Sequence, residues 1–331
     1  MQYKKLGTSD IKVSRLCLGT MTYGEQNSNN ESFELMNYAF EKGINFIDTA
    51  EIYPIYPKKE TSGRSEEIIG DWIKEKKNRQ KIIIASKIAS GHSKGVGATG
   101  LSWIRGGKKY LKFDKKNINK AIDNSLMRLK TDYIDLYQLH WPERNVPVFG
   151  QMDFKYDPKD NNWTPIEEVL ENFSKIIKSG KVRYLGLSNE TPWGIMSFIK
   201  LAKEKKLPLI VSVQNGYSLV NRLFDIANSE VSIRENCGLL AYSPLAGGRL
   251  SGKYITRKKL ENVRYSLWPK RFSRHHTKRG EKAIKKYVLL ANKHKILPST
   301  FANAFVNSRP FVTSNIIGAT NLTQLKENIQ S

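Results

Sequence analysis

A strand–helix–strand unit is read directly from three consecutive segments, YIDLYQLH (133–140), TPIEEVLENFSKIIKSGK (164–181) and RYLGLSN (183–189). The two outer segments are short and apolar, whereas the middle one has the period of an amphipathic helix. Thr164 is placed to cap this helix, with Pro165 as the first helical residue and Gly180 at its end. Strands that are apolar along their whole length indicate a parallel sheet that helices cover on its outer side.

Eight apolar runs of this kind recur along the chain, at 13–21, 44–50, 81–88, 133–140, 183–189, 210–217, 238–245 and 314–320. Helical periodicity lies between most of them, as at 31–43, 64–77, 116–130 and 164–181. Strand–helix alternation repeated eight times predicts an α/β fold, a single (β/α)8 TIM-barrel domain over residues 1–331. A doubly wound sheet is the competing architecture, but no GxGxxG motif follows an early strand.

Three connections are longer than a barrel needs, at 89–116, 141–163 and 246–278. Each leaves the C-terminal end of a predicted strand, which is where barrels build their active sites. Long loops in a compact domain are usually lids or binding loops. We therefore expect these three connections to lie over the mouth of an active site.

Composition excludes several classes of protein. The two cysteines, Cys17 and Cys237, lie far apart and outside any Cys/His cluster, so we expect neither a disulfide framework nor a metal site. Apolar runs stay well short of the ~18–20 residues that cross a membrane, and the N-terminus lacks a signal-peptide core. These features predict a cytoplasmic protein without a membrane partner.

The formal net charge of +24 raises the question of a polyanionic partner. The lysines and arginines are spread over many segments, and no aromatic-interleaved nucleic-acid motif accompanies them. We therefore expect no specific nucleic-acid partner, while a general polyanion-binding function remains an alternative. Since no heptad or exposed apolar stripe stands out, a monomer is the expected state.

Polar side chains at the ends of three neighbouring predicted strands form the main candidate site. Asp48 ends the second run and Tyr53 follows in DTAEIY, Lys87 ends IIIASK, and His140 ends YIDLYQLH. Neighbouring barrel strands release their ends into one bowl, so these four side chains can meet. Each alone has a structural explanation, such as an ion pair or a satisfied buried histidine. The four together favour catalysis.

These residue types can donate a proton to a substrate oxygen. A phenol titrates near pH ~10, and a close Lys87 ammonium would lower the pKa of Tyr53 by stabilising the phenolate. Asp48 would hold Lys87 charged and in place, and His140 would orient a carbonyl oxygen. A carbonyl polarised in this way needs a hydride that side chains do not supply, which implies a nicotinamide cofactor.

The chain resembles the aldo-keto reductases, in particular their Tas-like bacterial branch, which is related to the potassium-channel β-subunits. The matching stretches are RLCLGTMTYGEQNS (15–28), GINFIDTAEIYP (43–54), IIIASK (82–87), TDYIDLYQLHWPER (131–144), GKVRYLGLSNET (180–191), VQNGYSLVNR (213–222), LLAYSPLAGGRLSGKY (239–254) and IIGATNLTQLKEN (316–328). Asp48, Tyr53, Lys87 and His140 fall on the family's catalytic tetrad without substitution. The resemblance implies reduction of an aldehyde or ketone by NADPH.

The resemblance also implies a set of cofactor-binding residues. Those matching the nicotinamide end are Ser188, Asn189, Gln214 and Tyr242, and those matching the pyrophosphate loop are Ser243, Pro244, Leu245, Gly247 and Leu250. Lys253 and Arg264 match the cations for the phosphates, and Lys326 is a further candidate. The segment matching the adenosine end contributes Gly318, Ala319, Thr320, Gln324, Glu327 and Asn328. Asn321 has a plainer explanation as a helix cap. NADH is less expected than NADPH, although many members carry an arginine where this chain has Gln324.

The resemblance implies that Tas-like members continue for a further helix and tail beyond the position of Ser331, where this sequence ends. We therefore expect a short final helix and a shortened C-terminus. This feature motivates an alternative function, a cofactor-binding regulatory or interaction protein with little turnover. The intact tetrad favours the enzyme. The carbonyl substrate is not readable from the sequence.

Overall fold

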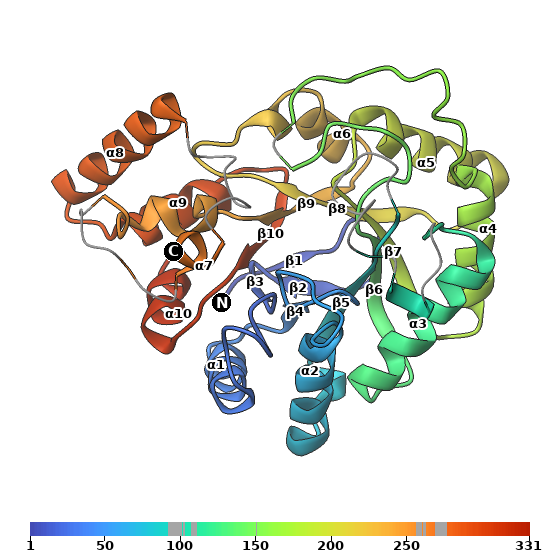
Figure 1. Ribbon diagram of the computed structural model, residues 1–331, viewed down its shortest axis with the longest axis horizontal. Helices are drawn as coiled ribbons and strands as arrows, with labels where there is room; N and C mark the ends of the chain where they lie inside the picture. The colour runs from blue at the N-terminus through green and yellow to red at the C-terminus, as the bar shows by residue number, and fades with distance from the viewer. Residues whose placement is uncertain are drawn as a thin grey trace.

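The computed structural model describes residues 1–91, 101, 103–106, 111–149, 151–255, 260, 263–268 and 277–331. Eight parallel strands close into a barrel in the order β10-β3-β4-β5-β6-β7-β8-β9 (Figure 1). Their bounds are β3 Leu16–Gly19, β4 Phe46–Asp48, β5 Ile83–Ile88, β6 Ile134–Leu139, β7 Val182–Ser188, β8 Ile210–Gly216, β9 Gly238–Tyr242 and β10 Val312–Ile317. The predicted (β/α)8 barrel is confirmed, and each of the eight apolar runs contributes one strand.

Helices surround the barrel and most pack on the outer side of its strands, whereas α8 packs on α9 and on the turn after β9 (Figure 1). Their bounds are α1 Asn29–Glu41, α2 Arg64–Lys76, α3 Lys115–Leu129, α4 Ile166–Lys178, α5 Pro192–Lys205, α6 Asn228–Arg234, α7 Arg264–Leu267, α8 Lys278–Lys293, α9 Pro298–Asn307 and α10 Leu322–Ile329. Short 3-10 turns are η1 Arg79–Lys81, η2 Ile104–Gly106, η3 Leu223–Asp225 and η4 Ala246–Ser251. The four helices predicted from periodicity correspond to α1 to α4.

The predicted cap of α4 is displaced by one residue. Pro165 rather than Thr164 occupies the N-cap position, and the helix begins at Ile166. The Thr164 backbone N–H and hydroxyl both donate to the carboxylate of Glu143, at 2.6 and 3.2 Å, so this side chain is held by a neighbouring loop. At the other end, Gly180 follows the helix with a φ of +81°, as a helix-terminating glycine does.

The barrel interior is filled by a separate apolar cluster. Inward-facing residues such as Cys17, Phe46, Ala85 and Leu136 come from successive strands and are fully buried. Side chains alternate between the two faces of a strand, so the inward residues two positions further along are Asp48, Lys87 and Gln138. The layer of polar side chains therefore lies directly above an apolar floor.

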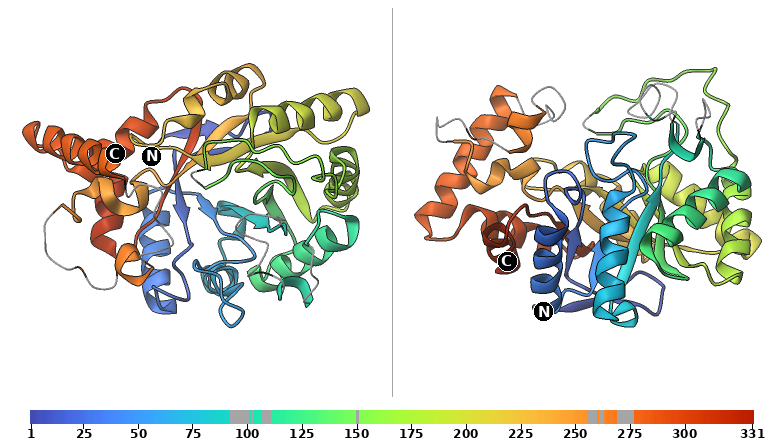
Figure 2. Two further views of the ribbon diagram at one scale, coloured as in Figure 1. Left: turned by 45° about the horizontal axis from the view of Figure 1, so that its top comes forward. Right: turned by 60° about the horizontal axis from the view of Figure 1, so that its bottom comes forward.

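An antiparallel hairpin closes the N-terminal end of the barrel, formed by β1 Tyr3–Lys5 and β2 Lys12–Ser14. Leu6 and Val13 of this hairpin are fully buried in the interior cluster. Gly7 has a φ of +55°, and a Cβ there would lie 2.1 Å from the Val211 carbonyl oxygen, so only glycine fits. In the right-hand view of Figure 2 the N-terminus lies at the opposite end of the molecule from connection 141–163.

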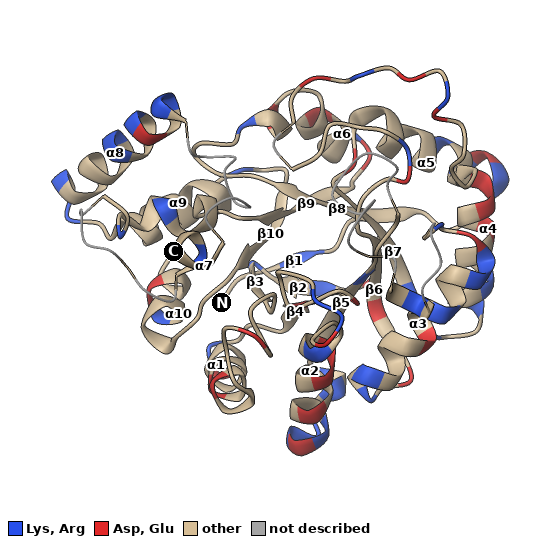
Figure 3. Ribbon diagram, viewed as in Figure 1, with Lys and Arg blue, Asp and Glu red and all other residues tan. Residues whose placement is uncertain are grey.

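The three long connections leave C-terminal strand ends, as predicted from the sequence. Parts of two of them, 92–100, 102, 107–110, 256–259, 261–262 and 269–276, lie outside the described residues, as does residue 150 of the third. Within the described part of the chain, no helix has the length and apolar character needed to cross a membrane. Figure 3 shows Lys and Arg on helices around the barrel, among them α2, α3, α4 and α8.

Candidate active site

A cavity of about 760 Å³ opens at the C-terminal ends of the strands. It extends from residues after β3, β4 and β6 to the segments after β9 and β10. Of the predicted site residues, all line this cavity except Lys87, Leu250 and the further candidate Lys326. Lys87 lies behind Tyr53 with a fully buried side chain, and Leu250 packs in a separate apolar cluster beneath the loop. The structure thus brings together the predicted residues, with the Leu250 and Lys326 side chains as the exceptions.

Lys87 connects the two other polar groups beneath the cavity. Its Nζ donates to Asp48 Oδ2 at 2.7 Å and to the Thr49 carbonyl oxygen at 2.7 Å, and it lies 3.3 Å from the Tyr53 hydroxyl. The predicted Asp48–Lys87 ion pair is therefore present, with 0% and 4% of the Lys87 and Asp48 side chains exposed. Such a buried pair is held in one geometry because separating its charges is costly.

The ionisation of Tyr53 differs from the sequence-based expectation. Burial raises the pKa of the Tyr53 phenol above its ordinary value, and the Lys87 ammonium reduces this rise without reversing it. Although burial lowers the pKa of Lys87, the Asp48 carboxylate and the Tyr53 hydroxyl outweigh that effect and hold the pKa above its ordinary value. At neutral pH the pair is thus a protonated phenol beside an ammonium, the state required of a proton donor.

His140 packs edge-to-face beside Tyr53 in the cavity wall, with ring centroids 5.8 Å apart and planes at 74°. Burial and then the Lys87 charge lower the pKa of its imidazole well below the ordinary value, so the ring is neutral. The buried Nδ1 atom has no hydrogen-bond partner among the described residues. A neutral imidazole retains one N–H donor, which suits hydrogen bonding to a substrate oxygen.

Two glutamine side chains hold the other oxygen of Asp48. Gln214 Nε2 donates to Asp48 Oδ1 at 2.7 Å, and Gln138 Nε2 does so at 3.4 Å. Gln214 also bonds to Gln138 Oε1 at 3.2 Å. Gln138 was not a sequence candidate, although it stands two residues before His140 and therefore points to the same side of β6. The alternation of side chains along β6 would therefore have been enough to predict Gln138 from the sequence.

The ends of β7, β8 and β9 form a hydrogen-bonded polar wall. The Ser188 hydroxyl donates to the Gln214 carbonyl oxygen at 2.9 Å, and Asn189 Nδ2 donates to the His140 carbonyl oxygen at 2.8 Å. The Tyr242 hydroxyl donates to Asn189 Oδ1 at 2.7 Å, which fixes the tilt of its ring in the cavity. Asn189 has a φ of +53°, a conformation that asparagine tolerates better than most residues.

The turn after β9 presents its backbone to the cavity. Ser243, Ala246 and Gly247 all have positive φ, at 57°, 49° and 71°. A Cβ on Gly247 would lie 2.8 Å from the Tyr265 hydroxyl, which itself donates to the Ala246 carbonyl oxygen at 3.1 Å. Turns built from left-handed residues expose backbone N–H groups that can cradle an anion.

Two cations lie close together beside this turn. Burial lowers the pKa of Lys253, and the neighbouring Arg264 charge lowers it further. Both residues line the cavity, whereas Lys326 does not and lies with its Nζ 5.5 Å from the centre of the Tyr38 ring. A pair of like charges facing a cavity is stabilised when an anion binds between them.

The segment after β10 combines an open backbone with fixed side chains. Gly318 is exposed, and a Cβ there would meet no atom within 4 Å. Asn328 Nδ2 donates to the Gly318 carbonyl oxygen at 3.2 Å, and Glu327 accepts from the Ser299 hydroxyl at 3.0 Å. Asn321 caps α10 by accepting the Gln324 N–H. The helix-cap explanation for Asn321 is therefore confirmed, and it coexists with a segment that lines the cavity.

The cavity thus combines a tyrosine hydroxyl above a buried lysine–carboxylate pair with a turn of left-handed residues after β9. The family model described as "Aldo/keto reductase family" matches residues 15–331. The chain belongs to this family.

Three similar proteins agree with this assignment. The chain is 42% identical to Protein tas of Escherichia coli over all of this chain and 93% of that protein. It is 41% identical to an aldo-keto reductase of Babesia bovis over 75% of this chain and 88% of that protein. The oxidoreductase YrpG of Bacillus subtilis is 31% identical over the whole of this chain and 91% of its own length.

Proposed function

We propose that the protein uses NADPH to reduce an aldehyde or ketone to an alcohol, with Tyr53 as the proton donor. The observation that carries this proposal is the Tyr53 hydroxyl at the cavity wall, 3.3 Å from the Nζ of a fully buried Lys87. The position of the His140 ring beside the Tyr53 ring in the same cavity wall supports it. Family membership supports the reaction class, while the tetrad geometry supports the roles of the individual residues.

The cavity fits a nicotinamide dinucleotide in its donor groups. Ser188, Asn189 and Gln214 line one end with amide and hydroxyl groups held in place by their internal hydrogen bonds, and the ring of Tyr242 lines the same end. The left-handed turn after β9 and the exposed backbone of Gly318 leave room for phosphates and a nucleoside. When bound, the nicotinamide supplies the hydride that a carbonyl carbon accepts.

Side chains of the protein then bind and protonate the substrate oxygen. His140, kept neutral by burial, donates a hydrogen bond that orients the carbonyl and withdraws charge from it. Tyr53 donates its proton to that oxygen as negative charge develops there. Lys87 stabilises the phenolate that results, and Asp48 keeps Lys87 charged and in place. Hydride and proton together convert the carbonyl into an alcohol.

Selectivity for NADPH is assigned to Lys253 and Arg264, the two cations that line the cavity beside the turn after β9. An additional phosphate would relieve the repulsion between them. Gln324, where many family members have arginine, accepts from the Thr320 N–H at 3.1 Å and offers no charge. We therefore expect NADPH to bind more tightly than NADH, through these two residues.

Titration of the purified protein with NADPH and NADH, followed by tryptophan fluorescence, tests the cofactor. Trp141 lies in the cavity wall and can report occupancy. NADPH consumption with a panel of aldehydes and ketones tests turnover. Tight binding without turnover on any carbonyl would favour the regulatory alternative. Absence of binding by folded protein would contradict the proposed function.

Tyr53→Phe separates chemistry from binding. Loss of the proton donor is expected to lower kcat by about 10²–10⁴-fold, because Phe has no exchangeable proton. The affinity for NADPH, measured by the same titration, should stay within about threefold, since phenylalanine keeps the shape of the side chain. A Tyr53→Phe variant with wild-type kcat would overturn the assignment of the proton donor.

A further inference from the structure

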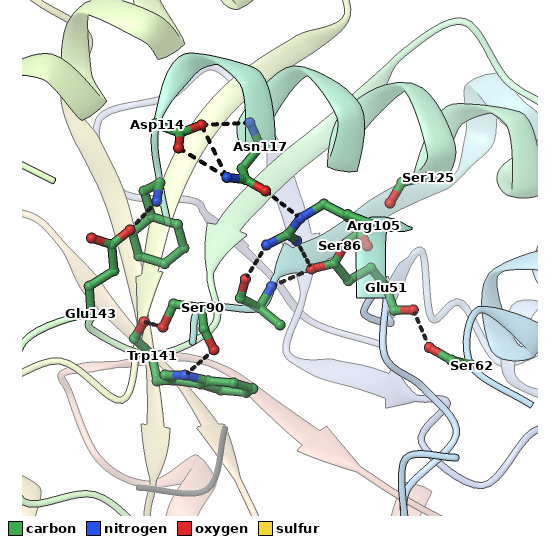
Figure 4. Close-up of polar contacts among 12 residues, drawn as sticks. Glu51, Ser62, Ser86, Ser90, Arg105, Asp114, Asn117, Ser125, Trp141 and Glu143 are labelled. Atoms are coloured by element: carbon green, nitrogen blue, oxygen red, sulfur yellow. Dashed lines mark hydrogen bonds and ion pairs between the residues drawn. The ribbon is translucent and has the colours of Figure 1, made fainter. Parts of the chain in front are cut away.

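A second buried ion pair lies beside the tetrad and has no part in the proton transfer just described. Arg105 Nη1 is paired with Glu51 Oε1, and only 2% and 3% of the two side chains are exposed. Glu51 stands two residues before Tyr53, whereas Arg105 comes from connection 89–116 (Figure 4). Burying both charges is costly unless their geometry and their other hydrogen bonds are well matched.

Both members of the pair bind the backbone of Ala89, the residue directly after β5. The Ala89 N–H donates to Glu51 Oε1 at 2.6 Å, and Arg105 Nη2 donates to the Ala89 carbonyl oxygen at 2.9 Å. The Glu51 N–H in turn donates to the Lys87 carbonyl oxygen at 3.2 Å. The pair thus connects the turn that carries Tyr53 with the strand end that carries Lys87.

Arg105 is also bound on its other side. Its Nε donates to Asn117 Oδ1 at 3.3 Å, and Asn117 is held in the first turn of α3 by the capping residue Asp114 (Figure 4). Arg105 itself has a φ of +52°, an uncommon conformation for a residue with a Cβ. Strained residues of this kind persist where the surroundings hold them and often occur at functional sites.

Residues around Arg105 form an apolar wall at the same end of the cavity as Tyr53. Leu101 and Ile104 pack in one cluster with Ile52, Tyr53 and Trp141. Leu101 lines the cavity directly. The position of this wall therefore depends on whatever holds Leu101 and residues 103–106 against the Tyr53 turn.

We propose that Arg105 is a positioning residue whose ion pair with Glu51 docks Leu101 and residues 103–106 on the turn that carries Tyr53. Docking sets the apolar wall against which a carbonyl substrate packs and holds the Tyr53 turn on the end of β5. The kinetic part of this proposal rests on the proposed reductase function, but docking itself does not.

The chain offers a matched control pair. Arg128 and Glu66 also form a buried ion pair, 2.6 Å long and with 17% and 0% of their side chains exposed, between α3 and α2. Neither residue lines the cavity. The test compares the double variant Glu51→Gln/Arg105→Met with Glu66→Gln/Arg128→Met, because each removes both charges and leaves none buried alone.

Glu51→Gln/Arg105→Met, the docking variant, is expected to raise KM for a carbonyl substrate by about 10- to 100-fold. Small misplacements of the residues that bind a substrate have effects of this size. NADPH affinity should be unchanged, because the predicted cofactor residues lie at the C-terminal ends of β7 to β9 and in the segments after β9 and β10. Hydrogen exchange of the Ile104 amide, which bonds to the Leu101 carbonyl oxygen at 3.0 Å, should accelerate. The control pair should change neither KM nor Ile104 exchange. The KM and the Ile104 exchange rate of Arg105→Lys should lie between those of the wild type and the docking variant. Lysine keeps the positive charge but lacks the planar guanidinium that reaches three partners.

The outcomes test the docking by Arg105 separately from the proposed reductase function. Equal Ile104 exchange in the docking and control variants would overturn the docking. Faster exchange with an unchanged KM would overturn the positioning role and leave the pair a structural one. Faster exchange in a protein whose wild type reduces no carbonyl would support docking while contradicting the proposed reductase function.

Discussion

The charged side chains at the Tyr53 end of the cavity differ in their pairing from those beside the turn after β9. At the Tyr53 end, Lys87 is neutralised within the protein by Asp48 at 2.7 Å, and both oxygens of that carboxylate accept hydrogen bonds. At the other end, Arg264 lowers the pKa of Lys253, as expected for like charges held close together. The charged groups at the Tyr53 end are paired within the protein, whereas Lys253 and Arg264 both line the cavity, where an anionic ligand can reach them. Folding thus fixes the positions of the proposed catalytic groups, whereas Lys253 and Arg264 are expected to contribute mainly to the affinity for an anionic ligand.

Removing the Asp48 carboxylate from the Tyr53 end should have the largest effect on the free energy of unfolding. Asp48→Asn leaves the Lys87 ammonium buried without a carboxylate, so the free energy of unfolding should fall by about 3–5 kcal/mol. Urea denaturation measures this change. Carbonyl reduction should fall together with stability, because Lys87 is no longer held beneath Tyr53.

The control for Asp48→Asn is an exposed ion pair of the same length. Lys181 and Asp123 also lie 2.7 Å apart, but 44% and 54% of their side chains are exposed. Asp123→Asn should change the free energy of unfolding by no more than about 1 kcal/mol. If Asp48→Asn costs no more than Asp123→Asn, the buried pair does not have the charge state described above.

The anion-dependent end should respond in binding and not in stability. Lys253→Met or Arg264→Met should weaken NADPH by about 10- to 100-fold, the effect of losing one or more charge-assisted contacts. The free energy of unfolding without nucleotide should change far less than in Asp48→Asn, because both side chains line the cavity and neither belongs to the buried Asp48–Lys87 pair. Fluorescence titration and urea denaturation of the same samples measure both quantities.

Lys326→Met is the matched control for that experiment. Lys326 lies near the segment after β10 but outside the cavity lining. Its removal should leave NADPH affinity unchanged. A weakening equal to that of Lys253→Met would mean that general positive charge, and not the cavity pair, attracts the nucleotide.

A smaller effect concerns the pH dependence of stability. The folded-state pKa of His140 lies well below its ordinary value of 6.5, because the ring is buried. Below about pH 6.5 the unfolded chain therefore binds a proton that the folded protein does not, and stability falls as the pH falls. This one group contributes a slope of up to about 1.4 kcal/mol per pH unit.

His140→Asn should remove that part of the slope between pH 7 and pH 5, as measured by urea denaturation at each pH. The exposed His294→Asn serves as the control. The pKa of Glu143 is raised by burial and acts with the opposite sign, but it is common to all variants and cancels in the comparison. An unchanged slope in His140→Asn would mean that this imidazole is already charged in the folded protein.

The sequence by itself determined the barrel and four of the groups that meet in its cavity. Apolar strands and amphipathic helices follow from the local period of side chains, and parallel strands necessarily release their ends on one side. Asp48, Lys87 and His140 each lie at or next to the C-terminal end of such a strand, and Tyr53 follows the first of them, so their meeting was predictable without knowledge of packing. Gln138 could have been added by the same alternation.

Only the tertiary structure decided how distant segments meet. Thr164 bonds to Glu143 and is lost as a helix cap, Leu250 packs away from the cavity, and burial outweighs Lys87 in setting the pKa of Tyr53. Glu51 and Arg105 carried no readable signal, since their pairing across 54 positions depends on a loop that folds back onto β5. Local periodicity encodes which face a residue takes, but hydrogen bonds and desolvation depend on atoms brought within a few ångströms by the whole fold.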